Sequence, residues 1–205
     1  LSAEQKRLLG ALSVFREPIE LAALTEQGLN IDELDSLVES GLARHADSDT
    51  YDVHDLIREF LLQSLDKQAK EDLHNKAVSW YNKQLPSSQI ALELIYHLIA
   101  SSRHEDATEL VVEQGRNLIK EGHIELLGLL ESIDTQSVAA ESACRVDRLR
   151  GEVLALLGRF DEAEEAFNLA KVPAEAAGLS DVIADILSNL ADIALKRGDS
   201  EESLG

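Results

Sequence analysis

The sequence predicts a mostly α-helical protein, in which a small helical domain with one short β-hairpin precedes an array of stacked helical hairpins. Three observations support this fold class. Apolar residues recur at helical spacing along most of the chain, only 3 prolines interrupt its 205 residues, and β-branched alternation is nearly absent. Similar glycine-containing joints also recur near Gly158 and Gly198, which indicates helix pairs that repeat and stack on their neighbours.

Residues 1–66 are predicted to form the first domain. A capping box that starts at Ser2 begins the first helix, Pro18 opens a second short helix, and Gly41 ends the third. A β-hairpin over residues 42–53 follows, and helical spacing returns after it. Three helices, a small hairpin and a further helix are the order expected of a winged-helix domain.

Residues 67–205 are predicted to form the helical array, which we expect to continue past Gly205. Gly198 is expected to lie in a joint between two helices, as Gly158 does. The helices are expected over these spans: 67–84, 88–101, 104–120, 123–132, 143–157, 160–177 and 181–197. Short polar joints between consecutive helices are typical of stacked helical hairpins.

The second half of the chain resembles the tetratricopeptide repeat. Ala163 and Phe167 have the Ala-x-x-x-Phe spacing of that repeat's second helix, and Gly151 fits the glycine of its first helix. Small residues are needed where two helices cross, with a large apolar side chain between them. Because the first helices of tetratricopeptide repeats line a binding groove, the resemblance implies a partner-binding groove formed by Arg145, Arg148, Glu152 and Ala155.

The arginines near residue 145 allow two interpretations. Arg145, Arg148 and Arg150 form the densest basic cluster of the chain, which would suit an acidic or carboxylate-bearing ligand. Alternatively, Arg148 pairs with Glu152 one helical turn later, and the cluster is an ordinary solvated face. The sequence favours the second interpretation.

The charge of the chain argues against nucleic acids and anionic membranes as partners. The sequence has 19 basic and 39 acidic residues and a net charge of −20, and such a surface repels both. Residues 1–66 contain 5 basic and 14 acidic residues, and the third helix carries carboxylates and no cation. The single cysteine, Cys144, excludes an internal disulfide; we expect it to be a buried small residue in a cytoplasmic protein.

A winged helix followed by helical repeats resembles the region after the nucleotide-binding domain of STAND-class signalling NTPases, which include the NB-ARC regulators. The likeness rests on three segments, 1–15, 34–42 and 51–60, and on Val53-His54-Asp55, which matches the Met-His-Asp motif of that family. The resemblance implies that His54 reaches the β-phosphate of bound ADP and that Asp55 caps the next helix and orients the loop. Alternatively, His54 only ends the hairpin and Asp55 is an ordinary N-cap.

The function predicted from these features is that of a regulatory and sensor region. The repeats would bind a protein or a small inducer, and the winged helix would relay that event to a nucleotide-binding domain of the same parent chain. ADP or ATP would bind in that full-length parent. The alternative is an interaction adaptor that involves no nucleotide. The sequence contains no phosphate loop, no catalytic spacing and no metal-binding histidine pair, so neither enzymatic activity nor a resident cofactor or metal is expected. The remaining histidines are expected at the surface or at interfaces.

Overall fold

The computed structural model describes residues 1–47 and 49–202, and the side chains of these residues as far as Gly198. The described chain forms two compact units, the first over residues 1–102 and the second from Arg103 onward. The domain boundary predicted at residue 66 falls inside the first unit, where the helix after it packs against the preceding residues.

The first unit consists of helices and one small antiparallel sheet. Its strands have the order β1-β3-β2, so β3 lies between the other two. Arg44 of β2 lies opposite Asp52 of β3, and Ile19 of β1 lies opposite Tyr51. The elements are α1 (Ala3–Ser13), β1 (Ile19–Glu20), α2 (Leu21–Glu26), the 3₁₀-helix η1 (Ile31–Glu33), α3 (Leu34–Glu39), β2 (Arg44–His45), β3 (Thr50–Asp52), α4 (Asp55–Ser64), α5 (Lys67–Tyr81) and α6 (Ser88–Ala100).

Local sequence signals account for most of these elements. The Ser2 hydroxyl accepts a hydrogen bond from the Gln5 backbone while the Gln5 side chain accepts one from the Ser2 backbone, which confirms the capping box. Gly41 ends α3 with a φ of 71°, a conformation that glycine adopts without strain. The predicted hairpin is confirmed as β2 and β3.

The segment after Pro18 corrects the prediction. The sequence predicted a helix that starts at Pro18 and includes Ile19, but Ile19 and Glu20 form strand β1 and the helix begins at Leu21. β1 exists because it pairs with β3, about thirty residues further along the chain. A strand of two residues has no periodicity of its own, so local pattern could not reveal it.

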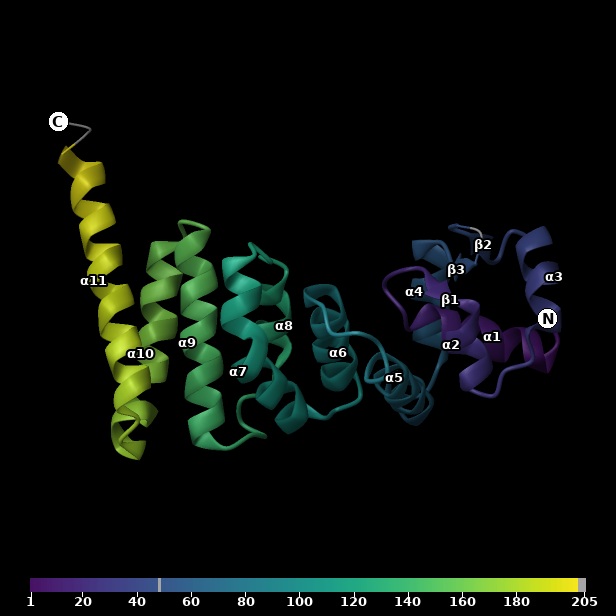
Figure 1. Cartoon of the computed structure of the whole chain (residues 1–205), viewed down its shortest axis with the longest axis horizontal. Helices are drawn as coiled ribbons and strands as arrows, with labels where there is room; N and C mark the ends of the chain where they lie inside the picture. The colour runs from purple at the N-terminus through teal and green to yellow at the C-terminus, as the bar shows by residue number, and fades with distance from the viewer. Residues whose placement is uncertain (48, 203–205) are drawn as a thin grey trace. The chain divides into compact units, whose positions relative to one another are not determined.

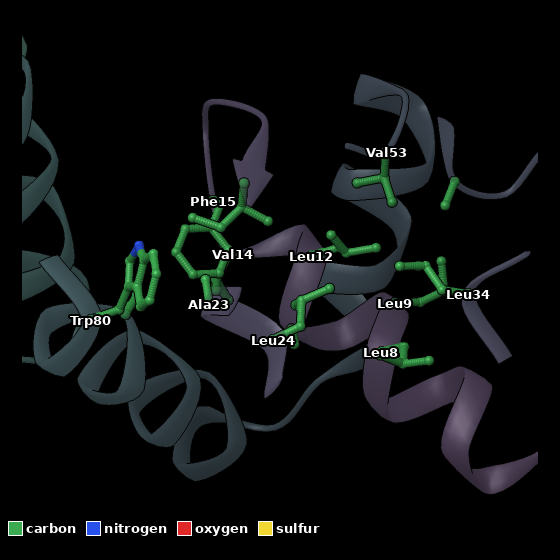
Figure 2. Close-up of a cluster of buried hydrophobic side chains, with 14 of the residues drawn as sticks. Leu8, Leu9, Leu12, Val14, Phe15, Ala23, Leu24, Leu34, Val53 and Trp80 are labelled. Carbon is green, nitrogen blue, oxygen red and sulfur yellow. The ribbon is translucent and has the colours of Figure 1, made fainter. Parts of the chain in front are cut away.

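A single hydrophobic core holds the first unit together. Figure 2 shows Leu8, Leu9 and Leu12 of α1 directed into this core, and Trp80 of α5 beside Phe15 and Ala23. Phe15 is 1% exposed, Trp80 is 7% exposed, and Tyr81 belongs to the same cluster. Packing of Trp80 and Tyr81 into this cluster joins α5 to the elements before it.

Two histidines of this unit lie in its interior, which corrects the expectation that they sit at the surface or at an interface. His74 of α5 is 4% exposed and His97 of α6 is fully buried. Their Nδ1 atoms are 2.8 Å apart, and the His97 ring also packs against Phe15 and Tyr81. One of the two Nδ1 atoms must donate and the other accept, so the contact requires that they do not both carry a proton.

The second unit consists of helices that stand side by side (Figure 1). α9 packs against α7, α8, α10 and α11, and α10 also packs against α11. The predicted spans match these helices to within a few residues at most ends. The helices are α7 (His104–Lys120), α8 (Leu126–Ser132), α9 (Ala140–Leu156), α10 (Phe160–Ala177) and α11 (Ser180–Glu202).

The glycines at the two predicted joints behave differently. Gly158 has a φ of 73° and separates α9 from α10, as predicted. Gly198 lies inside α11, so the joint predicted there is wrong. Glycine lowers helix stability but does not by itself end a helix, and no proline follows Gly198 to stop it.

The contact between α9 and α10 has the small-against-large packing that the sequence predicted. Phe167 is fully buried, and Ala163 and Ala170 on the same face of α10 are buried with it. A Cβ atom added at Gly151 would lie 2.6 Å from Cε1 of Phe167, so only glycine allows the ring this close to α9. Among the described residues, no helix is both long enough and apolar enough to cross a membrane.

Candidate functional site

The end of strand β3 places His54 at the start of α4. Val53 is fully buried and anchors the chain, and His54 occupies the N-cap position with an exposed side chain. The His54 side chain makes no capping hydrogen bond, so it leaves the first N–H groups of α4 without the acceptor that an N-cap side chain supplies. An uncapped helix N-terminus is a favourable place for an anion.

Asp52 fixes the geometry of this turn. Its carboxylate accepts hydrogen bonds from Arg44, from Arg58 and from the backbone N–H of Val53. Burial alone would raise the pKa of Asp52, but the Arg44 and Val53 hydrogen bonds and the charge of Arg58 hold that pKa below its usual value. Arg58 also donates to the Ser13 carbonyl at 3.4 Å, so the network links β3 and α4 to α1.

Arg44 determines which nitrogen of His54 carries the proton. Nη1 of Arg44 lies 3.4 Å from Nδ1 of His54. A guanidinium group can only donate, so Nδ1 accepts, and neutral His54 carries its proton on Nε2. The exposed imidazole therefore presents an N–H donor beside the start of α4, with the Arg44 guanidinium next to it. We call His54, Arg44 and the uncapped start of α4 the His54 cluster.

Asp55 has a different place from the one predicted. It is the first residue of α4 rather than its N-cap, which is His54. Its side chain is fully exposed, and its carboxylate lies 4.0 Å from Nε of Arg58. The helix begins one residue earlier than predicted because His54, two residues after the end of β3, already has the extended backbone of an N-cap. Asp55 contributes a negative charge to the first turn and no cap.

The sequence did not reveal Arg44 as part of the His54 cluster, nor Asp52 and Arg58 as the residues that hold its turn in place. The register of the hairpin places Arg44 directly opposite Asp52, and Arg58 lies one helical turn after the N-cap. Opposite charges at facing positions of a predicted hairpin were the available signal. The position of Arg58 over the end of α1 depends on tertiary packing, so no pattern of neighbouring residues in the sequence indicates it.

The four residues predicted to line a groove all lie on α9, and two of them border a hollow. Glu152 and Ala155 face a hollow of about 250 Å³ between α7, α9 and α11. Its apolar wall includes Leu156, which is 61% exposed. The other residues around it are Ile119 of α7 and Asn189, Asp192, Ile193 and Lys196 of α11. We call this hollow the α9 groove.

The two arginines among the predicted groove residues are neutralised within the chain. Arg148 is 5% exposed; it pairs with Glu152, as predicted, and lies 3.7 Å from Asp185 of α11. Arg145 pairs with Glu141 at 3.2 Å and with Asp181 at 3.1 Å. Their charges therefore tie α11 to α9 and are not available to attract an acidic ligand. The predicted pair of Arg148 with Glu152 is confirmed, but Arg148 is buried rather than on the solvated face that the sequence predicted.

Cys144 is a buried thiol, and the described residues contain no cluster of side chains that could hold a metal ion. Cys144 is buried in α9, as predicted, and burial raises the pKa of its thiol, which opposes formation of a thiolate. Among residues 1–47 and 49–198, no group of three or more His, Cys, Asp or Glu side chains could hold a metal ion.

The whole chain is similar in fold to one part of a larger solved protein. This is the crystal structure of a Signal Transduction ATPase with Numerous Domains (STAND) protein with a tetratricopeptide repeat sensor from Pyrococcus horikoshii. The two align with a TM-score of 0.62 and 20% sequence identity over 97% of this chain and 33% of that chain. The chain thus spans about a third of that protein and has a tetratricopeptide-like helical fold. No family model and no curated protein sequence matches it.

The acidic surface of the first unit leads to a prediction about DNA. η1 and α3 occupy the place of the third predicted helix, and their charged side chains are Asp32, Glu33, Asp35 and Glu39. We expect no binding of duplex DNA even at low salt, because these carboxylates would repel the phosphates. A gel-shift titration at low ionic strength measures this. A shift that weakens as salt is added would contradict the prediction.

Proposed function

We propose that this chain is the regulatory and sensor region of a STAND-class signalling NTPase. The observation that carries the proposal is the fold similarity over 97% of the chain to a STAND protein with a tetratricopeptide repeat sensor. In this proposal the α9 groove and the helices around it bind a protein or small-molecule inducer. The first unit relays that event to a nucleotide-binding domain elsewhere in a cytoplasmic parent protein, and this region performs no catalysis itself.

Residues 1–66 are assigned within this proposal to a winged-helix domain. The order helix, strand, two helices, strand, strand supports the assignment, as does the sheet order β1-β3-β2. The hairpin of β2 and β3 would be the wing. The acidic third helix is unsuited to DNA, so a protein surface is the more favourable partner for the domain.

The His54 cluster is assigned as the contact to the nucleotide phosphates in the full-length parent. Three kinds of donor support this role: the Nε2–H of His54, the Arg44 guanidinium and the uncapped N–H groups of α4. Leu56 is 82% exposed and Phe60 is 70% exposed, and both follow His54 on α4. An apolar pair this exposed suits a surface that another domain covers. Asp55 would act only through its charge and its contact with Arg58.

His54→Ala in the full-length parent is expected to weaken ADP binding by about ten-fold or more. A hydrogen bond to a charged phosphate is worth about 1.5–3 kcal/mol, and the variant removes it. The measurement is the rate of ADP dissociation from the purified parent. His123→Ala, which changes a histidine of the second unit, is the matched control and should release ADP at the wild-type rate.

If His54→Ala releases ADP at the wild-type rate, His54 only ends the hairpin and does not contact the nucleotide. That result would favour the adaptor function, in which no nucleotide takes part. Arg44→Ala is a less specific test, because the Arg44 side chain also holds Asp52 at 2.6 Å. A loss of affinity in that variant could come from a displaced β3 as well as from a lost phosphate contact.

A further inference from the structure

The first unit contains a hollow that neither the His54 cluster nor the α9 groove includes. It has a volume of about 190 Å³ and lies between β1, the end of α5 and the first half of α6. Its apolar walls include Ile19 of β1, Trp80 of α5 and Ile90 of α6. Figure 2 shows the indole of Trp80, which borders the hollow, beside Phe15. Tyr81, the last residue of α5, also lines it, and we call it the Tyr81 hollow.

Within the described chain, every charged side chain that lines the Tyr81 hollow is a carboxylate. Glu17 and Glu20 are exposed, and neither forms an ion pair with any of the described residues. Glu93 is 2% exposed and pairs with Arg16 at 2.7 Å. Burial nevertheless raises the pKa of Glu93, so this ion pair does not fully offset the cost of burying the carboxylate. The hollow therefore carries a net negative charge that suits a cation, and the net charge of −20 on the chain attracts cations towards it.

The Tyr81 hydroxyl has no hydrogen-bond partner in the part of the chain that the structure describes, although Tyr81 is only 6% exposed. It is not among the unpaired polar atoms that are sealed from solvent, so a ligand can reach it. Burial and the charges of Glu93 and Glu17 raise the pKa of Tyr81. The hydroxyl therefore stays protonated and lies near two carboxylates of the hollow. An unpaired polar group on a residue this buried is uncommon, and its oxygen is free to accept a hydrogen bond.

We propose that the Tyr81 hollow binds a primary ammonium group on an apolar stem, such as an alkyl amine or the side chain of a lysine residue of a partner. The three N–H groups of the ammonium donate to the carboxylates of Glu17 and Glu20 and to the Tyr81 hydroxyl oxygen. The stem packs on Trp80 and the other apolar walls. A metal ion suits the hollow less well, because the described residues include no group of three or more side chains that could hold one. This assignment does not depend on the proposed nucleotide-related function.

The test uses the intrinsic fluorescence of Trp80, the chain's single tryptophan. The probes are pentylammonium, 1-pentanol, which has a similar size and no charge, and tetramethylammonium, which has the charge and no N–H group. A short peptide with one lysine and the same peptide with that lysine acetylated form a second pair. Pentylammonium or the lysine peptide should change the emission saturably, and the uncharged counterparts and tetramethylammonium should bind at least about ten-fold more weakly. The ammonium probe that binds more tightly identifies the source of the ammonium group.

Three variants assign the signal to the hollow. Tyr81→Phe should weaken binding of the ammonium probes about ten-fold, and it should not lower the melting temperature of the unliganded chain, because the hydroxyl it removes has no partner there. Glu17→Gln/Glu20→Gln should weaken binding by at least a similar factor, whereas Asp35→Asn/Glu39→Gln, an equal charge change on α3, should not affect it. The proposal is overturned if neither ammonium probe gives a saturable change, if Tyr81→Phe binds them as the wild type does, or if tetramethylammonium binds as tightly as they do.

Discussion

Replacing Phe167 with alanine is expected to lower the free energy of unfolding of the second unit by about 3–5 kcal/mol. Phe167 is fully buried between α9 and α10, and its ring lies against the backbone at Gly151. Glycine has no side chain that could move into the vacated space, so the cavity stays largely open. Chemical denaturation followed by far-ultraviolet circular dichroism measures the change, because the second unit is helical throughout most of its described length.

Two variants separate this packing effect from a general loss of helix stability. Leu169→Ala shortens a side chain on the same helix that is 61% exposed, and it should change stability by no more than about 0.5 kcal/mol. In the wild type, Gly151→Ala should lower the free energy of unfolding, since the new methyl group would clash with the Phe167 ring. In the Phe167→Ala background the same methyl group partly fills the cavity, so it should restore part of the lost stability. If Gly151→Ala has the same effect in both backgrounds, the proposed contact between ring and backbone is wrong.

The sequence predicted those parts of the structure that depend on neighbouring residues. The capping box at Ser2, the turns at Gly41 and Gly158, and the spacing of Ala163 and Phe167 all act within one or two helical turns. Each is enforced by backbone sterics or by a hydrogen bond to a near neighbour, so the pattern and the structure have the same cause. The helix spans followed from the same local rules.

The features that the sequence did not predict depend on contacts between distant segments. Strand β1 forms only because β3 lies beside it, and the Nδ1–Nδ1 contact joins His74 to His97 across two helices. The Val53-His54-Asp55 motif identified His54 from the sequence. Arg44 lies next to it because of the register between β2 and β3, which the motif does not contain. Opposite charge at helical spacing predicted the pairing of Arg148 with Glu152, but it could not predict the second partner, Asp185, which comes from α11. Tertiary packing determines each of these, and local pattern does not.

The buried histidine pair is expected to make the first unit less stable in mildly acidic solution. Burial, together with the charge of Lys70, lowers the pKa of His74 to about 4. Burial, with smaller contributions from His74 and Arg16, holds the pKa of His97 well below its usual value. In the unfolded chain both histidines titrate near 6.5. The unfolded state therefore binds more protons between these values, and stability is lost as the pH falls from about 6.5 towards about 4.

The expected loss from His74 alone is about 3 kcal/mol over this range, since one pKa unit corresponds to about 1.4 kcal/mol. Glu93 acts in the opposite direction, because burial raises the pKa of its carboxyl above the usual value despite its hydrogen bond with Arg16. A Glu93 with a raised pKa costs stability at neutral pH, and that cost fades as the pH falls. The contribution of the histidines must therefore be measured as a difference between the wild type and a variant that lacks them.

The comparison is between the wild type and the double variant His74→Leu/His97→Leu, with unfolding at pH 7 and pH 5 followed through Trp80, which lies in the same unit. Leucine has a similar volume and no titrating group, so the double variant should lose less stability than the wild type between the two pH values. His45→Gln, which changes an exposed histidine, should keep the wild-type dependence. The histidine resonances of the native wild type give a second measurement that does not depend on how well the variant folds. His74 and His97 should remain neutral at pH 5, and full protonation of either ring near pH 6.5 would show that burial does not suppress their charge.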